Sequence, residues 1–340
     1  MNTSVTQNPP SPAAPPVDSA AGQFQSLILS SGVYGLSDRV KLALTGKDRV
    51  RWLNGMITNN VRDLAAGQGV YGFLLTPQGK ILGDLFAYNR GESILVDTDQ
   101  AQLAKVQETL KRYIIMDKVE IAEVSDKFGV LGLAGPKSAE LLRTAGLKVG
   151  ELGALQLVDI TWQGIALTVV GGDNPAVPSY EFWIAPQNMP TLQAALLEAG
   201  AKQVGAEALE LLRIASGVPR YRQDIRDRDL PQETGQARAL NFNKGCYIGQ
   251  EIVERIRARG NVHRMFTGFL VAGELPTAGT KIQSQDKDVG EVTSIATLPL
   301  QSGESKVALG YLRREAAAKE LTAGPAILSV TDLPLRQVFG

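Results

Sequence analysis

The sequence contains a single cysteine, Cys246, and a single histidine, His263, among its 340 residues. One cysteine excludes an internal disulfide framework and is typical of a protein from a reducing compartment. The two residues are also too few to form a closed zinc site or a protein-bound iron–sulfur cluster. We therefore expect no stably bound metal, and any cluster chemistry would need a thiol from another molecule or take place on another protein.

The chain also lacks a long uncharged apolar segment and an excess of charge of either sign. It has 35 basic and 35 acidic residues, which give a formal net charge of zero. No overall field therefore attracts nucleic acid or a membrane surface, and an anionic ligand must be bound by a local group of basic residues. A length of 340 residues and a hydrophobic content of 44% predict two or three soluble domains.

The N-terminal residues lack the features of a secretory signal. Residues 1–20 contain five prolines and no basic residue, whereas a signal peptide needs a positive start and an apolar core. Many prolines and low hydrophobicity predict a disordered tail over residues 1–20. We expect a cytoplasmic protein that does not contact the membrane.

Predicted strands and helices occur in runs rather than in strict alternation, which indicates an α+β fold. Gly32 and Gly35 are interpreted as breakers after a first helix over residues 24–29. Strands are predicted over residues 40–44, 69–75, 81–88, 94–97, 119–124, 128–133, 160–170 and 180–185. The spacing of the runs 69–75 and 81–88 about residues 76–79 predicts a hairpin. Helices are predicted over residues 50–57, 100–113, 189–199 and 206–215.

From residue 265 onward, short strands and frequent turns predict a small β-barrel. The expected strands cover residues 266–271, 281–283, 290–298, 306–312 and 326–330. The sequence thus predicts a tail over 1–20, two α+β lobes over 21–264 and a C-terminal β-barrel domain over 265–340.

The segment 241–259 carries the most distinctive pattern. Gly245 and Gly249 bracket Cys246, and isoleucines four residues apart predict a helix from Gln250. A cysteine ahead of a helix and two residues from Lys244 lies in positive potential, which favours a reactive thiolate. The alternative is that the lone cysteine is an inert small apolar residue.

Residues 244–251 read Lys-Gly-Cys-Tyr-Ile-Gly-Gln-Glu. This octapeptide resembles the signature of the folate-binding protein YgfZ family, which is related to the glycine-cleavage T-protein, an aminomethyltransferase. The stretch before the signature, residues 212–219 with Asp224 and 230–233, is similar to both YgfZ and the T-protein. Residues 44–49 and 53–60 look like the family's opening helix, and residues 67–69 and 75–80 continue the likeness through the first hairpin. The resemblance implies a three-lobed, T-protein-like fold that holds tetrahydrofolate or a one-carbon derivative in a central channel. It also implies that Cys246 is the key functional residue, in a catalytic role with Lys244, for supporting iron–sulfur cluster assembly or repair in client enzymes. Tyr247, next to Cys246, is expected to contact the cofactor.

The resemblance points to Glu181 as the residue that binds the pterin of the folate. A carboxylate accepts two hydrogen bonds in one plane, which suits the donor edge of a pterin. Strand alternation places Trp183 on the same face as Glu181, and a face with a carboxylate and an aromatic ring suits a pterin, so Trp183 is also expected to contact the cofactor. Without the resemblance, an exposed glutamate on an edge strand is the simpler interpretation.

Arg213, in an otherwise apolar helix, is similarly placed to meet a folate carboxylate, and a buried structural ion pair is the alternative. The following loop alternates arginines and aspartates, so we interpret it as a solvated or lobe-bridging loop. The basic segment 255–264 is interpreted as a solvated helix face; it could instead contact tRNA phosphates or a polyglutamate tail.

T-proteins carry an essential aspartate in an Asp-Asp pair after the first hairpin, where this chain has Gly83-Asp84. If that aspartate corresponds to Gly83, the chain has lost a group needed for transfer chemistry. Asp84 would then point to the opposite face and could contact the ligand. An accessory folate-binding protein is therefore our main prediction, and an aminomethyltransferase or a tRNA-modification factor are the alternatives.

Overall fold

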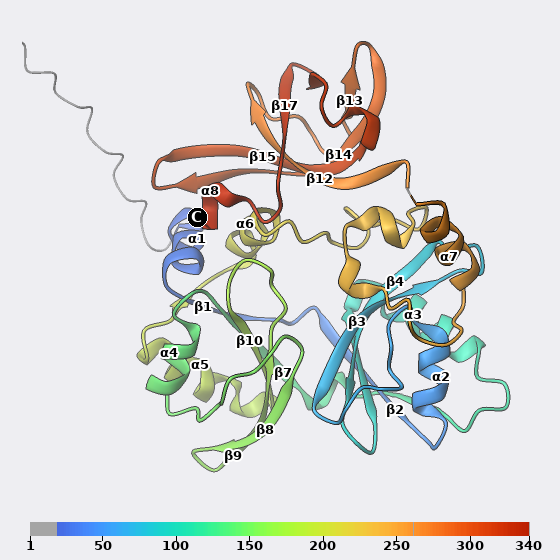
Figure 1. The fold of residues 1–340 in the computed structure, drawn as a ribbon. Coiled ribbons are helices and arrows are strands. Elements are labelled where there is room, and N and C mark those ends of the chain that lie inside the picture. Colours follow the sequence, from blue (N-terminus) through green and yellow to red (C-terminus); the bar gives the residue numbers. More distant parts are fainter. Residues whose placement is uncertain (1–18, 261, 340) are drawn as a thin grey trace, which may run out of the picture.

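The structure is a computed structural model that describes residues 19–260 and 262–339. It consists of two α+β lobes that lie side by side below a C-terminal β-barrel (Figure 1). Of the tail predicted over residues 1–20, residues 1–18 lie outside the part of the chain that the structure describes. Ser19 already caps the first helix, α1 (Ala20–Leu29), because its hydroxyl accepts a hydrogen bond from the Gly22 N–H.

The first lobe is built on a five-stranded sheet with the order β3-β4-β5-β2-β6. The hairpin predicted from the sequence is present, with strands β3 and β4 joined by a tight turn at Gly79. The elements of this lobe are β2 (Arg39–Thr45), α2 (Arg49–Met56), β3 (Gln68–Leu75), β4 (Ile81–Asn89), β5 (Ile94–Asp99), α3 (Leu103–Arg112) and β6 (Glu120–Glu123).

The second lobe is a six-stranded sheet with the order β11-β1-β7-β10-β9-β8. Its strands are β1 (Gly32–Gly35), β7 (Gly129–Ala134), β8 (Leu157–Trp162), β9 (Ile165–Gly171), β10 (Ser179–Ile184) and β11 (Lys202–Gln203). Its helices are α4 (Ser138–Thr144), α5 (Met189–Glu198) and α6 (Ala206–Ala215).

Two local predictions for the second lobe are wrong. Gly32 and Gly35 do not break the chain but form strand β1, where a Cβ on Gly32 would lie 2.7 Å from the Val204 side chain. The single strand predicted over residues 160–170 is a hairpin. Gln163 and Gly164 turn the chain with φ values of 50° and 80°, which is the geometry that joins two twisted antiparallel strands.

The C-terminal region is a closed barrel with the strand order β12-β15-β14-β13-β16-β17. Its elements are β12 (Arg264–Ala272), β13 (Lys281–Ser284), β14 (Lys287–Leu300), β15 (Gly303–Arg313), β16 (Leu321–Ala323) and β17 (Ala326–Thr331), followed by α8 (Arg336–Phe339). β16 was not predicted because it has only three residues. At a bulge between Val292 and Ser294 in β14, the Ser294 hydroxyl donates a hydrogen bond to Asp224, which lies outside the barrel. The predicted α+β fold with a C-terminal barrel is confirmed.

The loop between α6 and α7 (Gln250–Arg259) contacts both lobes and the C-terminal barrel. Arg226 and Arg228 form ion pairs with Glu291 of the barrel. Asp227 pairs with Lys105 of the first lobe at 2.6 Å. The lobe-bridging interpretation of this loop therefore holds. None of the helices in residues 19–260 and 262–339 is long and apolar enough to span a membrane.

Candidate functional site

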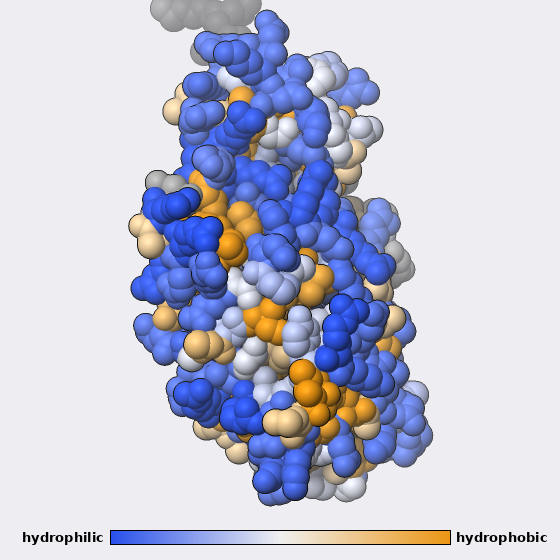
Figure 2. All heavy atoms as spheres, turned by 90° about the vertical axis from the view of Figure 1, so that its right-hand side faces the viewer, coloured by the Kyte–Doolittle hydropathy of each residue, from blue (hydrophilic) through white to orange (hydrophobic). Residues whose placement is uncertain are grey.

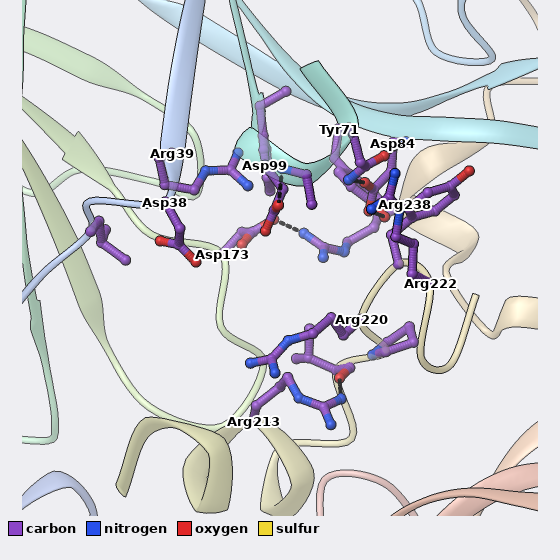
Figure 3. A pocket seen from close by; sticks show the side chains of 17 residues that line it. Asp38, Arg39, Tyr71, Asp84, Asp99, Asp173, Arg213, Arg220, Arg222 and Arg238 are labelled. Carbon is purple, nitrogen blue, oxygen red and sulfur yellow. Dashed lines mark hydrogen bonds and ion pairs between the residues drawn. The ribbon is translucent and has the colours of Figure 1, made fainter. Parts of the chain in front are cut away.

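A cavity of about 240 Å³ lies where the two lobes meet the bridging loop (Figure 3). Its wall is strongly charged, with arginines and aspartates that come from both lobes. The charged and aromatic side chains that line it include Arg39, Tyr71, Asp84, Asp173, Arg213, Arg220, Arg222 and Arg238. We call this cavity the outer chamber.

A second cavity of about 210 Å³, here called the inner chamber, adjoins the outer one. The two chambers share Asp173, Arg213 and Val218 as a common wall. The inner chamber is otherwise lined by aromatic, apolar and acidic side chains, among them Tyr34, Tyr180, Glu181, Leu209 and Leu212. The outer chamber combines five arginines with four aspartates, whereas the inner chamber has Glu181 beside aromatic and apolar side chains.

Glu181 is the acidic group of the inner chamber. It lies on β10, which pairs with β7 on one side and β9 on the other, so the alternative of an edge strand is wrong. Its Oε2 accepts a hydrogen bond of 3.2 Å from the Trp183 indole N–H. This is the one hydrogen bond of its carboxylate among the described residues. Burial raises the pKa of Glu181, the neighbouring Asp97 raises it further, and the Lys41 ammonium opposes this rise.

Trp183 supports Glu181 and does not offer its ring to a ligand in the inner chamber. Its side chain shares a face with Glu181, as strand alternation predicts, but the residue is only 2% exposed. The Tyr88 ring packs edge-on at 4.9 Å, and the Lys41 Nζ lies 4.2 Å from the centre of the Trp183 ring. The expected direct contact of Trp183 with a ligand in the inner chamber is therefore not what the structure shows, and its indole N–H contacts Glu181 instead.

Asp84 lines the outer chamber and is held by two side chains. Tyr71 donates its hydroxyl to Oδ2 at 2.7 Å, and Gln102 donates to Oδ1 at 2.6 Å. Gly83 faces the other way, since a Cβ there would lie 3.0 Å from Gln102 Oε1 and 3.3 Å from Val106. The hypothesis that Gly83 marks a carboxylate lost from the cavity is therefore wrong, because the cavity-facing position of this pair is Asp84.

Arg213 forms part of the wall between the chambers, but it has no N–H left for a ligand. Nε and Nη2 donate to Glu210, Nη1 donates to the Val218 carbonyl and to Asp224, and Nη2 also donates to Ser294. A guanidinium has five N–H groups, so every donor is used within the protein. The predicted role as a folate ligand is corrected, and the alternative of a buried structural ion pair is what the structure shows.

Cys246 is exposed and lies outside both chambers. Its loop docks on the first hairpin through Gly249, where φ is 83° and a Cβ would lie 2.6 Å from the Thr76 carbonyl oxygen. Helix α7 then begins at Gln250, as predicted. Figure 2 shows the face of the molecule formed by the first lobe and α7, which is mostly hydrophilic with several separate apolar patches.

Lys244 is buried and anchors the loop that carries Cys246. Its Nζ donates to the backbone carbonyls of Asn54, Ile57 and Asn59 at 2.5, 2.6 and 2.7 Å. These groups lie at the C-terminal end of α2, where a cation is stabilising. Burial lowers the pKa of Lys244 to about 7, and Arg62 contributes to the lowering. All three ammonium donors are used, so the predicted catalytic role is corrected to a structural one.

The remaining predicted residues of this region are also part of the protein's own packing. Tyr247 belongs to a core cluster with Tyr71 and Phe73 and lies outside both chambers, so it is not a cofactor contact there. In the basic segment, Arg255 pairs with Glu251, and Arg264 pairs with Asp229 and Glu233. Among the described residues, no group of three or more metal-ligating side chains comes together.

No pattern in the sequence predicted several of the residues that line the outer chamber. Arg39 pairs with Asp97 at 2.5 Å, and Arg238 pairs with Asp173 while its guanidinium lies 4.5 Å from the centre of the Tyr71 ring. These are single charges in ordinary strands and loops, and only the folded chain brings them together.

Comparison with known proteins is consistent with this architecture. The profile of the GCVT N-terminal domain matches residues 16–244, and that of the CAF17 C-terminal β-barrel domain matches residues 262–334. The chain belongs to the GCVT family. Within that family, its CAF17-type barrel agrees with the expected relationship to YgfZ proteins.

The curated relatives of this GCVT-family chain include transferases. It is 28% identical over 309 residues to a chloroplastic protein of Arabidopsis thaliana that is named as a transferase, covering 88% of this chain and 70% of the relative. It is 28% identical over 276 residues to the aminomethyltransferase of Rubrobacter xylanophilus, covering 80% and 74%. Aminomethyltransferase T of Bartonella henselae shares the fold, with a TM-score of 0.82 and 22% identity over 93% of this chain and 89% of that one.

Proposed function

We propose that this GCVT-family protein binds tetrahydrofolate, or a one-carbon derivative of it, with the pterin in the inner chamber against Glu181. The observation that carries the proposal is the Glu181 carboxylate, which faces a cavity and receives one hydrogen bond, from Trp183. The remaining acceptor sites suit the adjacent N–H donors at the edge of a pterin. Glu181 is half-buried, so its spare acceptor sites favour a ligand or water that satisfies them.

The other walls of the inner chamber also suit a flat, partly apolar ring. Tyr34 and Tyr180 supply aromatic surface, and Leu209 and Leu212 supply apolar surface. Ligand pockets typically combine such apolar walls with a few polar groups that fix the orientation of the ligand. In this arrangement Glu181 sets the orientation of the pterin, and Trp183 sets the orientation of Glu181.

The test is a calorimetric titration of the purified protein with tetrahydrofolate. We expect saturable binding by the native chain and a loss of roughly tenfold or more for Glu181→Gln, because a charge-assisted hydrogen bond contributes about 1.5–3 kcal/mol. Glu198→Gln, at the exposed end of α5, is the matched control. Binding that is equal in all three proteins would remove Glu181 from the proposal.

We further propose that the protein supports the assembly or repair of iron–sulfur clusters in client enzymes and that Cys246 is needed for this role. Support comes from the YgfZ-type signature and from the exposure of the thiol, which leaves it accessible to another protein. In cells that lack the native protein, Cys246→Ala should fail to restore iron–sulfur enzyme activities while still binding tetrahydrofolate in vitro. Full restoration by this variant would end the proposed role of the thiol.

An aminomethyltransferase is the second candidate, and Asp84 is the observation that favours it. Its carboxylate faces the outer chamber and is held by Tyr71 and Gln102, and several relatives are named aminomethyltransferases. Formation of methylene-tetrahydrofolate from an aminomethyl-lipoyl carrier protein, with its loss in Asp84→Asn, would support this candidate. Tetrahydrofolate binding without turnover would support the accessory role.

A tRNA contact through residues 255–264 remains an alternative prediction, as does a cytoplasmic location. The ion pairs of Arg255 and Arg264 with nearby carboxylates reduce the charge available for phosphates. A filter-binding series at increasing salt would show a steep decrease of affinity if several phosphates are neutralised, and a flat, weak response would exclude the tRNA contact.

A further inference from the structure

Arg222 has an unusual backbone conformation at the edge of the outer chamber. Its φ is 71°, in the left-handed region that non-glycine residues rarely adopt. Such a conformation costs of order 1–3 kcal/mol and persists only where the surrounding structure fixes it. Here the Arg222 N–H donates to the Ile225 carbonyl at 2.7 Å, and the Asp224 N–H donates to the Arg220 carbonyl at 2.8 Å.

The turn that carries Arg222 is held by contacts with both lobes and with the C-terminal barrel. Asp224, which is fully buried, accepts hydrogen bonds from the second-lobe residue Arg213 and from Thr293 and Ser294 of the barrel. Tyr221 donates to the Leu82 carbonyl of the first lobe at 2.5 Å. The position of Arg222 relative to the chamber is therefore determined by rigid elements rather than by a free loop.

The guanidinium of Arg222 differs from the other arginines of the chamber in its partners. Arg39, Arg220 and Arg238 each form an ion pair, with Asp97, Glu210 and Asp173 respectively. Arg222 is exposed and lines the chamber, yet among the residues described it has no carboxylate within ion-pair distance and donates no side-chain hydrogen bond. Figure 3 shows it among the arginines and aspartates around this space.

We propose that Arg222 binds a carboxylate of the glutamyl tail of the folate, so that this position provides the anion subsite of the outer chamber. The inference rests on the proposed function, because it assumes that the pterin occupies the adjoining inner chamber. A folate joins a pterin to an anionic tail. The two chambers share a wall, with Glu181 in the inner chamber and, in the outer one, five arginines and four aspartates, among which Arg222 forms no ion pair with any described residue.

The chemistry of arginine suits this role. A guanidinium recognises a carboxylate through two parallel N–H donors, with more geometric specificity than an ammonium provides. Because the turn is already fixed, little ordering is required when the tail binds, and preorganisation of this kind increases affinity. The strained φ of Arg222 is then explained as the means by which the turn presents a guanidinium that forms no direct ion pair within the described part of the chain, since the nearby Asp227 pairs with Lys105 instead.

The test compares tetrahydrofolate with tetrahydropteroate, which has the same pterin but no glutamyl tail. We expect the native protein to bind tetrahydrofolate roughly 10- to 100-fold more tightly, the range given by one charge-assisted contact. Arg222→Gln should reduce this ratio to near one while leaving the affinity for tetrahydropteroate unchanged. Arg228→Gln, an exposed arginine of the same loop, should keep the native ratio.

Arg222→Gly provides a control for folding, because glycine adopts a positive φ without strain. This variant should unfold at a higher urea concentration than Arg222→Gln and show the same loss of discrimination. If tetrahydrofolate binds but Arg222→Gln keeps the native ratio, the subsite assignment is wrong and the proposed function stands. If the native chain binds neither compound, the proposed function itself fails.

Discussion

Replacement of Arg213 by methionine separates a structural role from a ligand role for this residue. The substitution removes five donors at distances of 2.7–2.9 Å and leaves the Asp224 carboxylate, which is 0% exposed, without its cation. Breaking a buried ion pair from one side costs about 3–5 kcal/mol, because the remaining charge is uncompensated. Since proteins are stable by only about 5–15 kcal/mol, this is a large fraction of the total.

Urea unfolding followed by tryptophan fluorescence measures this cost. We expect Arg213→Met to lower the free energy of unfolding by about 3–5 kcal/mol. Arg255→Met, which removes an exposed helix pair with Glu251, should change it by no more than about 0.5 kcal/mol. The double variant Arg213→Met with Asp224→Asn should lose less than the sum of the single variants, because the unpaired charge is also removed.

The opposite pattern would refute this reasoning. If Arg213→Met unfolded at the native urea concentration but lost tetrahydrofolate binding, its donors would have to be free for the ligand. The saturated hydrogen bonding of the Arg213 guanidinium would then be a wrong description of the wall between the chambers.

Three further predictions concern single residues. Lys41→Met should raise the pKa of Glu181 further, because it removes a cation that opposes the effects of burial and of Asp97. The loss of tetrahydrofolate affinity on acidification should therefore begin at a higher pH in Lys41→Met than in the native chain, whereas Lys41→Arg should retain the native pH profile. Lys281 and Arg226 lower the pKa of Glu291 to about 2, against the effect of burial. The ionised Glu291 carboxylate should therefore contribute its full stabilisation above pH 4.5, and this contribution should be lost as the pH falls toward 2. Urea unfolding at a series of pH values should show a weaker pH dependence of the free energy of unfolding in Glu291→Gln than in the native chain. Gly249→Ala should destabilise the protein by about 1–3 kcal/mol because of its positive φ and the nearby Thr76 carbonyl, whereas Gly245→Ala, which meets only the end of the Arg62 side chain, should be tolerated.

The parts of the fold that follow from local pattern were predictable from the sequence. The spacing of residues 69–75 and 81–88 about a four-residue turn predicted the first hairpin, and the isoleucine spacing predicted α7 after Gly249. Gly32 and Gly35 were misread because glycine often ends an element, whereas here its small size lets β1 pack against Val204. That reason depends on a residue far along the chain and has no local signal.

The site was predictable only in part, for the same physical reason. Glu181 and Asp84 were identified from the resemblance, and both line the chambers. The saturation of Arg213 depends on Asp224 and Ser294, which come from the bridging loop and the barrel. Likewise, the faces of Gly83 and Asp84 could be assigned only once α3 was seen to cover the Gly83 side.

A crystal structure of the protein with bound tetrahydrofolate would test the central claim most directly. We predict that the donor edge of the pterin lies within hydrogen-bond distance of the Glu181 carboxylate, with the tail in the outer chamber. A pterin bound elsewhere, with the Glu181 carboxylate facing solvent in the complex, would contradict the account.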